Sequence, residues 1–329
     1  MMRDRVPVRS ILTLLFTSLL IMGGCSKYEE TSRETIRIGT NYWLGYEPLY
    51  LAKGLGVMDR SRIRLVEYGS NTEVIEAYRN GVIEGAALTL DEALLMAEEQ
   101  VPLKLLMVLD YSKGADSVIA REGIESVADL KNKRLGVETN ALGTYMLSRM
   151  LEKGKLSAGD VKVTHVEFEQ HEEVFDAKTV DAVITFEPVR SRLLLKGARE
   201  IFTSAEIPGE IIDVLVVRPE LFDNFPETLR HLINGWYGAL EYLKMDPDAA
   251  YRHMEMRQQL GQKEMAGALQ TLEFPERVEN CRLFSDGAVE INERIENLQK
   301  VMREYNLLER MVLTGEISDA PVERLLCSD

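Results

Sequence analysis

Short apolar runs alternate with helix-like segments over residues 36–213, and this alternation constrains the fold more than any other feature of the chain. In the first part, strands are predicted at residues 36–38, 63–68, 85–88 and 103–109, and helices at 47–53, 72–80 and 91–99. Strands that are joined through helices pair in parallel, because such a connection returns the chain to the same edge of the sheet. The pattern therefore predicts an α/β protein in which mainly parallel sheets are flanked by helices.

A second unit of the same kind follows. Its strands are predicted at residues 117–120, 134–137, 161–168 and 182–186, and its helices at 142–152 and 171–177. Even without its first residues, the 329-residue chain is longer than one hydrophobic core usually covers, so two domains are expected.

The chain changes character after the strand-like run 214–217 and becomes mainly helical. Apolar residues at helical spacing predict a core-facing stripe: Leu229, Leu232, Ile233, Trp236, Tyr237, Leu240 and Leu243. A second stripe predicts an amphipathic helix docked on the body: Ile291, Ile295, Leu298, Met302 and Tyr305.

The first residues have the pattern of an export signal. A basic start is followed by an apolar stretch over residues 11–22, which is shorter than the roughly 20 residues that cross a bilayer. Small residues before Cys25 resemble the lipobox of bacterial lipoproteins, in which this cysteine carries a lipid. We expect a signal peptide over residues 1–24 and a polar tether over 25–35. An uncleaved anchor helix and an ordinary secretory signal are the alternatives.

The charged residues, histidines and cysteines of the chain limit which partners and cofactors are expected. The net charge of −15, without a cluster of Lys and Arg, argues against a nucleic-acid partner. The four histidines are scattered, and no Cys or His pair has zinc-ligand spacing, so we expect neither a metal nor another cofactor. Cys281 and Cys327 either pair or stay free in an oxidising compartment.

Four stretches carry a family resemblance. Residues 36–48, Ile-Arg-Ile-Gly-Thr-Asn-Tyr-Trp-Leu-Gly-Tyr-Glu-Pro, resemble the opening of substrate-binding proteins of ABC transporters, in the nitrate, sulfonate, taurine and thiamine-pyrimidine family. Residues 81–87, 136–145 and 181–188 resemble later landmarks of that family, with Glu84 in place of an Asp. The likeness covers about residues 36–245.

The resemblance implies a two-lobed, type II periplasmic-binding fold. Lobe 1 would hold residues 36–115 and 214–329, with the C-terminal helices, and lobe 2 would hold residues 116–213. The implied function is a monomeric, extracytoplasmic lipoprotein, anchored through Cys25 and facing the periplasm or exterior. It would capture a small organic nitrogen or sulfur compound between the lobes, since a ligand that contacts both lobes favours the closed form. An ABC permease and its ATPase would then receive the ligand.

Ligands of open α/β sheets bind at the carboxyl ends of the strands, and this rule selects loops of both lobes. The candidate contacts are Asn41, Tyr42, Trp43, Tyr46, Thr89, Asp91, Asn140, Thr144, Glu187 and Asp213. Several have alternative roles. Thr89, Asp91 and Asn140 are also suited to cap helices, and the carboxylates of Glu187 and Asp213 to bond within the protein. At least one of the aromatic residues is expected to pack beneath its loop.

The candidate loops contain acidic residues, and the loops at residues 40–46 and 140–144 contain no Arg or Lys. This favours a neutral or cationic nitrogen compound, although N–H groups at the helix start near Asn140 could hold an anion. A solute-sensing lipoprotein is one alternative function. A thiamine-pyrimidine synthase-like enzyme is another, against which stand the export signal and the absence of a Cys-rich segment. No catalytic residue is predicted.

Overall fold

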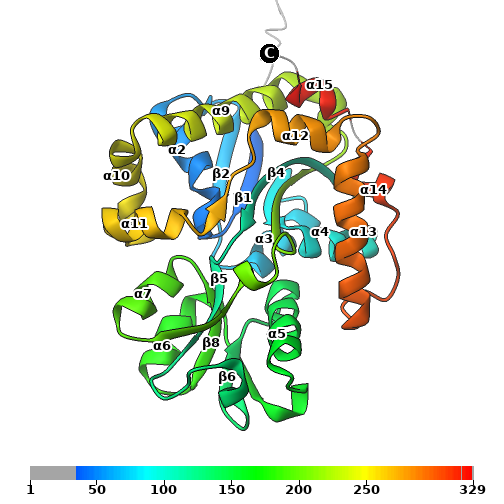
Figure 1. Cartoon of the computed structure of the whole chain (residues 1–329). Helices are drawn as coiled ribbons and strands as arrows, with labels where there is room; N and C mark the ends of the chain where they lie inside the picture. Colours follow the sequence, from blue (N-terminus) through cyan, green and yellow to red (C-terminus); the bar gives the residue numbers. More distant parts are fainter. Residues whose placement is uncertain (1–34, 320, 328–329) are drawn as a thin grey trace, which may run out of the picture. The chain divides into compact units, whose positions relative to one another are not determined.

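The computed structural model describes residues 35–319 and 321–327. Their strands form two sheets (Figure 1). The first sheet has six strands in the order β11-β4-β10-β3-β1-β2. Their bounds are Ile36–Thr40 for β1, Ile63–Glu67 for β2, Gly85–Thr89 for β3, Lys104–Ser112 for β4, Ile212–Val217 for β10 and Leu272–Glu273 for β11.

The second sheet has five strands in the order β7-β6-β8-β5-β9. Their bounds are Asp116–Ala120 for β5, Arg134–Val137 for β6, Lys162–His165 for β7, Ala182–Phe186 for β8 and Arg199–Thr203 for β9. The sequence pattern did not predict β9, which is only partly buried and lacks a continuous apolar run.

The predicted α/β architecture is confirmed, and in each sheet most strands run in the same direction, with antiparallel strands among them. Strand β1 pairs in parallel with β2 and β3, and β6 pairs in parallel with β7 and β8. Strand β10 is antiparallel to β3 and β4, and β5 is antiparallel to β8 and β9. The reason is the route of the chain. A strand that enters one sheet from the other begins at the edge where the parallel strands end, so it runs in the opposite direction.

Helices α2 (Glu47–Leu55), α3 (Asn71–Arg79) and α4 (Leu90–Glu98) alternate with the strands of the first sheet. Helices α5 (Ala141–Gly154), α6 (His171–Asp176) and α7 (Val189–Leu195) accompany the second sheet (Figure 1). The later helices are α8 (Leu221–Asn224), α9 (Pro226–Met245), α10 (Pro247–Gln258), α11 (Gln262–Leu269), α12 (Arg277–Phe284), α13 (Val289–Glu304), α14 (Thr314–Ser318) and α15 (Glu323–Leu326). Helix α7 was not predicted.

Both predicted apolar stripes are confirmed. In α9, Pro226 occupies the first turn and the stripe from Leu229 to Leu240 is buried, with Trp236 fully so. In α13, the side chains of Ile291 and Met302 are fully buried, and charged residues occupy the other face. These helices are therefore held by apolar burial against the body of the protein.

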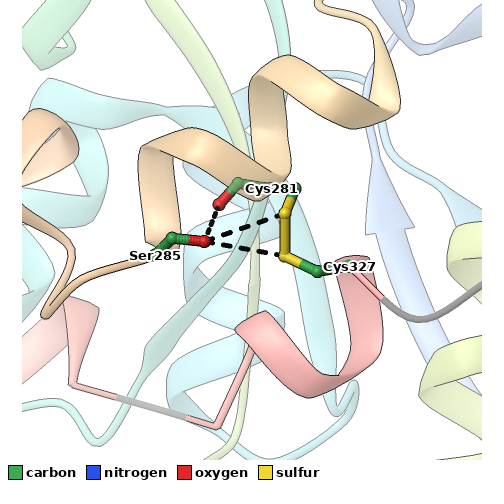
Figure 2. The surroundings of a disulfide bond; sticks show 3 residues. All are labelled: Cys281, Ser285 and Cys327. Atoms are coloured by element: carbon green, nitrogen blue, oxygen red, sulfur yellow. Dashed lines mark hydrogen bonds between the residues drawn. A yellow bond between two sulfur atoms is a disulfide. The ribbon is translucent and has the colours of Figure 1, made fainter.

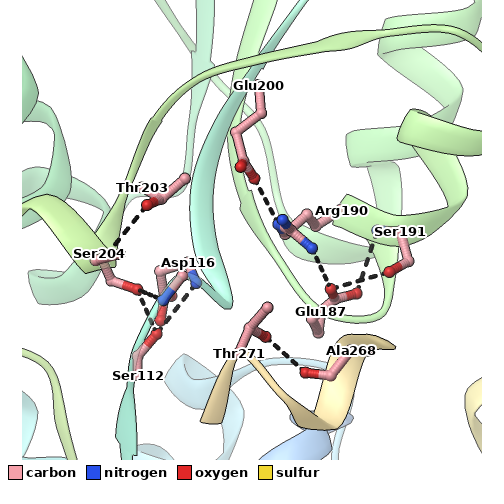
Figure 3. A network of polar contacts seen from close by, with 12 residues as sticks. Ser112, Asp116, Glu187, Arg190, Ser191, Glu200, Thr203, Ser204, Ala268 and Thr271 are labelled. Atoms are coloured by element: carbon pink, nitrogen blue, oxygen red, sulfur yellow. Dashed lines mark hydrogen bonds and ion pairs between the residues drawn. The ribbon is translucent and has the colours of Figure 1, made fainter. Parts of the chain in front are cut away.

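The chain passes between the two sheets twice, at residues 113–115 after β4 and at residues 204–211 before β10. A hydrogen bond joins these two crossings, because the hydroxyl oxygens of Ser112 and Ser204 lie 2.7 Å apart (Figure 3). The backbone N–H of Gly114 also donates to the Ser204 hydroxyl at 2.6 Å. Gly114 has φ +119°, a backbone conformation that favours glycine.

Cys281 and Cys327 form a disulfide, which settles the question that the sequence left open. It joins α12 to the residue after α15, and the Ser285 hydroxyl lies next to it (Figure 2). The expected signal peptide and the lipidation site Cys25 lie outside the described residues. Within the described part, we find no helix with the length and apolar character needed to cross a membrane.

Candidate ligand-binding site

One pocket is lined by residues from both sheets. The first sheet and its connections contribute Asn41, Trp43, Tyr46, Asn71, Thr89 and Asp213, and the second contributes Asp116, Leu142 and Phe186. Each lies at or near an edge where a parallel strand ends or an entering antiparallel strand begins.

Strand register brings the acidic residues to this edge. Asp213, near the start of β10, is paired with Thr89 at the end of β3 on one side and with Asp110 of β4 on the other. Asp116, at the start of β5, is paired with Phe186 at the end of β8. The two strands that enter from the opposite sheet therefore each place a carboxyl group in the pocket wall.

Aromatic rings form the apolar part of the wall. The Trp43 ring lies edge-on to Phe186, with ring centres 5.6 Å apart, and Phe186 stacks on Phe168 at 4.2 Å. Trp43 and Phe186 come from different sheets, so this contact spans the pocket. The loop after β1 is fixed from within, because the Asn41 side-chain oxygen accepts a hydrogen bond from the Trp43 backbone N–H at 2.9 Å.

Two buried carboxyl groups are held by donors from that loop. The Trp43 indole N–H donates to Asp110 at 3.2 Å, and the Tyr46 hydroxyl donates to Oδ1 of Asp213 at 2.5 Å. Burial raises the pKa of both Asp110 and Asp213 well above the ordinary range, and the charges of neighbouring acidic residues raise them further.

Four side-chain oxygens in the pocket wall have no hydrogen-bond partner within the described protein. They are Oδ1 of Asn71, Oγ1 of Thr89, Oδ2 of Asp116 and Oδ2 of Asp213. These residues are only 6%, 3%, 2% and 2% exposed. Buried polar atoms are normally paired, so four unpaired oxygens around one pocket indicate a place where a ligand or water supplies the missing partners.

Other acidic residues lie close to this site. Burial raises the pKa of Asp116 to about 7, and the charges of Asp91 and Glu187 add to the effect. Burial likewise raises the pKa of Asp91 to about 6, and those of Glu92 and Glu138 to about 8. The pocket is therefore surrounded by carboxyl groups that hold protons more firmly than usual.

Among the described residues that line the pocket, none is Arg or Lys. Two nearby arginines are engaged elsewhere. Arg257 bonds to Glu47 at 2.6 Å, and Arg190 bonds to Glu187 at 2.9 Å and to Glu200 at 2.6 Å (Figure 3). The electrostatic character of the wall is thus set by acids.

The model of the NMT1-like family matches residues 29–257, which is more than half of the chain. The chain belongs to the NMT1-like family. This match confirms the resemblance that residues 36–245 carry.

Curated relatives of this NMT1-like protein are binding proteins. It is 25% identical over 196 residues to an Escherichia coli (strain K12) protein whose name proposes the binding of aliphatic sulfonates. It is 26% identical over 129 residues to a Brachyspira hyodysenteriae protein whose name proposes a periplasmic binding component of an ABC transporter. The matches cover 58% and 39% of this chain, and 61% and 37% of those relatives. The aligned part is therefore less than two thirds of either relative.

Solved structures share the fold of this NMT1-like protein at low sequence identity. The alkanesulfonate-binding protein SsuA from Xanthomonas axonopodis pv. citri, bound to MOPS, aligns with a TM-score of 0.72 and 18% identity, covering 85% of this chain and 96% of SsuA. The desulfurization enzyme DszB aligns with a TM-score of 0.67 and 16% identity, covering 89% and 98%. The two-lobed binding-protein fold is thus confirmed, and it is one that an enzyme also uses.

The structure of this NMT1-like protein brings half of the predicted contacts to the pocket. Asn41, Trp43, Tyr46, Thr89 and Asp213 line it. Asn41, Trp43 and Tyr46 follow a parallel strand of the first sheet and Thr89 ends one, as the rule on carboxyl ends of strands requires, whereas Asp213 lies near the start of the antiparallel strand β10.

The other predicted contacts have partners elsewhere. The Asn140 side chain caps α5 by accepting from the Gly143 N–H at 2.7 Å, and the Thr144 hydroxyl donates to the Asn140 carbonyl at 2.9 Å. Glu187 accepts hydrogen bonds from Arg190 and Ser191, as the alternative role required.

Tyr42 and Asp91 are also absent from the pocket wall. Tyr42 lies half-buried, with the Arg257 guanidinium 5.7 Å from its ring centre. Asp91 is buried in the first turn of α4 and has one carboxyl oxygen without a partner.

Four wall residues were missed. Asp116 begins an antiparallel strand, for which the rule on the carboxyl ends of parallel strands makes no prediction; Asp213, which lies near the start of the other entering strand, was predicted from the implied family fold. Phe186 ends a predicted strand, and only residues after strand ends were selected there. Leu142 lies within a loop that was selected for its polar residues, and Asn71 is the first residue of α3 and has no apolar signal of its own.

Proposed function

We propose that this protein is the extracytoplasmic solute-binding component of an ABC importer. It captures a small organic molecule in the pocket between its two sheets and delivers the molecule to the permease and its ATPase. The observation that carries this proposal is the shared pocket, in which both sheets contribute buried side chains and four buried oxygens have no partner within the described residues.

The geometry supports binding through closure of the two lobes, here assigned as residues 36–115 with 214–329 and residues 116–213. A ligand that touches Asp213 of one sheet and Asp116 of the other makes both contacts only when the lobes are close together. Such a ligand shifts the population toward the closed form, and a transporter can recognise that form. The two crossings joined by Ser112 and Ser204 are the places where this motion would occur.

Binding is favoured over catalysis by the chemistry of the pocket wall. Its described residues carry no thiol and no imidazole, and the two cysteines of the described part are joined in a disulfide. These are the groups that most often serve as nucleophile and base in hydrolytic sites. We therefore assign the role of a binding protein rather than that of an enzyme such as DszB.

The proposed location is the outer face of a membrane, with the chain held by a lipid on Cys25 and acting as a monomer. The disulfide supports an oxidising compartment, where such bonds persist. A protein that senses a solute and signals to a membrane partner would use the same closure, so transport has to be tested directly.

Two experiments test this proposal. In the first, the full chain is purified in mild detergent and its thermal unfolding is recorded against a panel of small metabolites. A true ligand raises the unfolding temperature and is recovered unchanged. Conversion of that compound into a product would contradict the proposal.

In the second experiment, uptake of the labelled ligand is measured in cells that lack this protein. Loss of uptake, restored by the wild-type chain, is expected of an importer. Unchanged uptake with a lost transcriptional or motile response would instead assign a sensing role. A Cys25→Ser variant, measured in the same cells, should be released from the membrane fraction.

A further inference from the structure

We propose that the ligand is a small organic cation whose N–H groups bind Asp116, Asp213 and Asn71, while its carbon skeleton lies against Trp43 and Phe186. This inference rests on the proposed function, because it names the class of solute for the same pocket. It departs from the sulfonate that the names of two similar proteins mention.

The unpaired atoms in the wall are all oxygens. Those of Asp116 and Asp213 are carboxyl oxygens, which accept hydrogen bonds in their ionised form, and that of Thr89 is a hydroxyl oxygen, which accepts as well as donates. The free atom of Asn71 is also an oxygen, because its side-chain N–H₂ donates to Glu92 at 2.7 Å. The same Glu92 oxygen accepts from the Thr89 backbone N–H at 3.2 Å, so it acts as an acceptor and fixes the orientation of the amide. With its aspartates ionised, the wall therefore calls for a ligand that brings donors.

A second reason is that an anion would find no cationic partner in the described wall. Sulfonates are usually held by Arg or by a group of N–H donors, and the described wall contains no Arg or Lys. The start of α5 was the predicted source of N–H groups. Its Gly143 N–H is bound to the Asn140 side chain at 2.7 Å, and its Thr144 N–H is bound to the Asn140 carbonyl at 3.2 Å.

A third reason is that the buried aspartates at the pocket have no cationic neighbour in its described wall. Asp110 is bonded to the Trp43 indole and Asp213 to the Tyr46 hydroxyl, and neither of these donors is a cation. Asp116 also has no basic neighbour in the wall. Without a positive partner these carboxyl groups keep their protons more firmly, because an isolated buried charge is costly. A bound cation would stabilise their ionised form at the point where the two sheets meet.

A fourth reason is the aromatic character of the wall. The faces and edges of Trp43, Tyr46 and Phe186 surround the polar atoms, and aromatic faces attract cations as well as apolar groups.

The experiment compares ligands that share a skeleton and differ in charge. The probes are butylammonium and butanesulfonate, and benzylammonium and benzenesulfonate, each titrated into the full chain in mild detergent at pH 7.5. Thermal unfolding is the first readout, and calorimetric titration gives the dissociation constant of any probe that raises the unfolding temperature.

The expected result is that the ammonium member of at least one pair binds at least tenfold more tightly than its sulfonate partner. The Asp213→Asn and Asp116→Asn variants should each weaken that binding at least tenfold. The matched control is Asp223→Asn, which changes an exposed aspartate in α8 and should leave the dissociation constant within twofold of the wild type.

Two other results would overturn the inference. Binding of a sulfonate in preference to its ammonium partner would assign an anion to the pocket and leave the proposed function intact. Absence of binding by all four probes and by the metabolite panel described above would contradict the proposed function as well. Because the paired probes are compared on the wild-type chain, the test stands even where an aspartate variant fails to fold.

Discussion

Asp116 illustrates how much the position of one residue decides. It is the first residue of β5, it is paired with the last residue of β8, and it is buried without a basic neighbour in the pocket wall. A carboxyl group in such a place keeps its proton to a higher pH than it does in water. The raised pKa of Asp116 therefore follows from the direction in which the chain enters the second sheet.

This position makes the stability of the ligand-free protein depend on pH. Burial, with smaller effects from Asp91 and Glu187, raises the pKa of Asp116 from its ordinary value of 3.8 to about 7. Over that window the folded protein holds a proton that the unfolded chain has released, so the free energy of unfolding falls as the pH rises. The charges that face this site include those of Asp110, Glu138 and Asp213, whose raised pKa values change stability in the same direction.

An Asp116→Asn variant should lose the part of the pH dependence of stability that Asp116 causes. Compared with the wild type, it should gain a few kcal/mol of unfolding free energy at pH 8 and change little at pH 4. Urea unfolding at a series of pH values measures the effect, with Asp223→Asn as the control. Equal slopes for Asp116→Asn and wild type would show that Asp116 titrates as an ordinary surface carboxyl.

Trp43 has two roles at the residue scale, because its ring contacts Phe186 and its N–H bonds to Asp110. A Trp43→Phe variant keeps an aromatic ring and removes the donor, so it should lose about 1–3 kcal/mol of stability and bind ligand more weakly. Trp236→Phe is the control, since that buried indole N–H has no partner among the described residues. If denaturant unfolding gave the same loss for both variants, the bond to Asp110 would contribute nothing measurable.

At the scale of elements, Glu187 belongs to a local network of hydrogen bonds. Its carboxylate accepts hydrogen bonds from Arg190 and Ser191 of α7, and Arg190 continues to Glu200 of β9 (Figure 3). This network connects β8, α7 and β9, three consecutive elements of the second sheet.

A Glu187→Gln variant should therefore weaken the fold and not the site. Removal of one partner from a buried ion pair costs about 3 kcal/mol, whereas the dissociation constant of the ligand should stay within about twofold. Chemical unfolding and calorimetric titration measure the two quantities. A tenfold loss of affinity at unchanged stability would return Glu187 to the list of ligand contacts.

The disulfide acts on the C-terminal helices. Cys281 and Cys327 close a loop with a sequence separation of 46 residues, and they tie α12 to the end of α15 (Figure 2). A Cys281→Ser, Cys327→Ser double variant should lose about 2–4 kcal/mol of stability. Dithiothreitol should destabilise the wild type to the same extent and leave the double variant unchanged. Equal stability of reduced and oxidised wild type would contradict a stabilising role.

The sequence predicted most elements for a physical reason. Apolar runs and helical stripes report burial, and burial is what holds α9 and α13 in place. Strand direction is different, because nothing local in residues 116–120 or 212–217 specifies whether the neighbouring strand is parallel. The pairing of β5 and β10 is set by where the chain crosses between sheets, which is a tertiary property.

The candidate site shows the same contrast between what local sequence predicts and what the tertiary structure decides. Asn41, Trp43 and Tyr46 were predicted because a loop after the first strand must face the edge where ligands bind. Asp116 was missed because an antiparallel strand begins at that edge, and Asn140 was predicted although its side chain is needed to cap α5. Competition between capping and ligand contact is decided by geometry that spacing alone does not contain.

At the scale of the whole molecule, these observations on the pocket support one proposal for the ligand. The two sheets share a pocket whose free atoms accept hydrogen bonds, whose described wall has no Arg or Lys, and whose aromatic rings come from both sides. A small organic cation satisfies each of these conditions and is the solute that we propose for this member of the NMT1-like family.

The most direct test is to identify the small molecule that the protein carries in nature. The full chain is purified from the cells that make it and then denatured, and the released compounds are identified by mass spectrometry. We expect a single organic amine or amidine in close to equimolar amount with the protein. The same compound should be absent from an Asp213→Asn variant purified in the same way. Release of a sulfonate or another organic anion in equimolar amount would contradict this proposal.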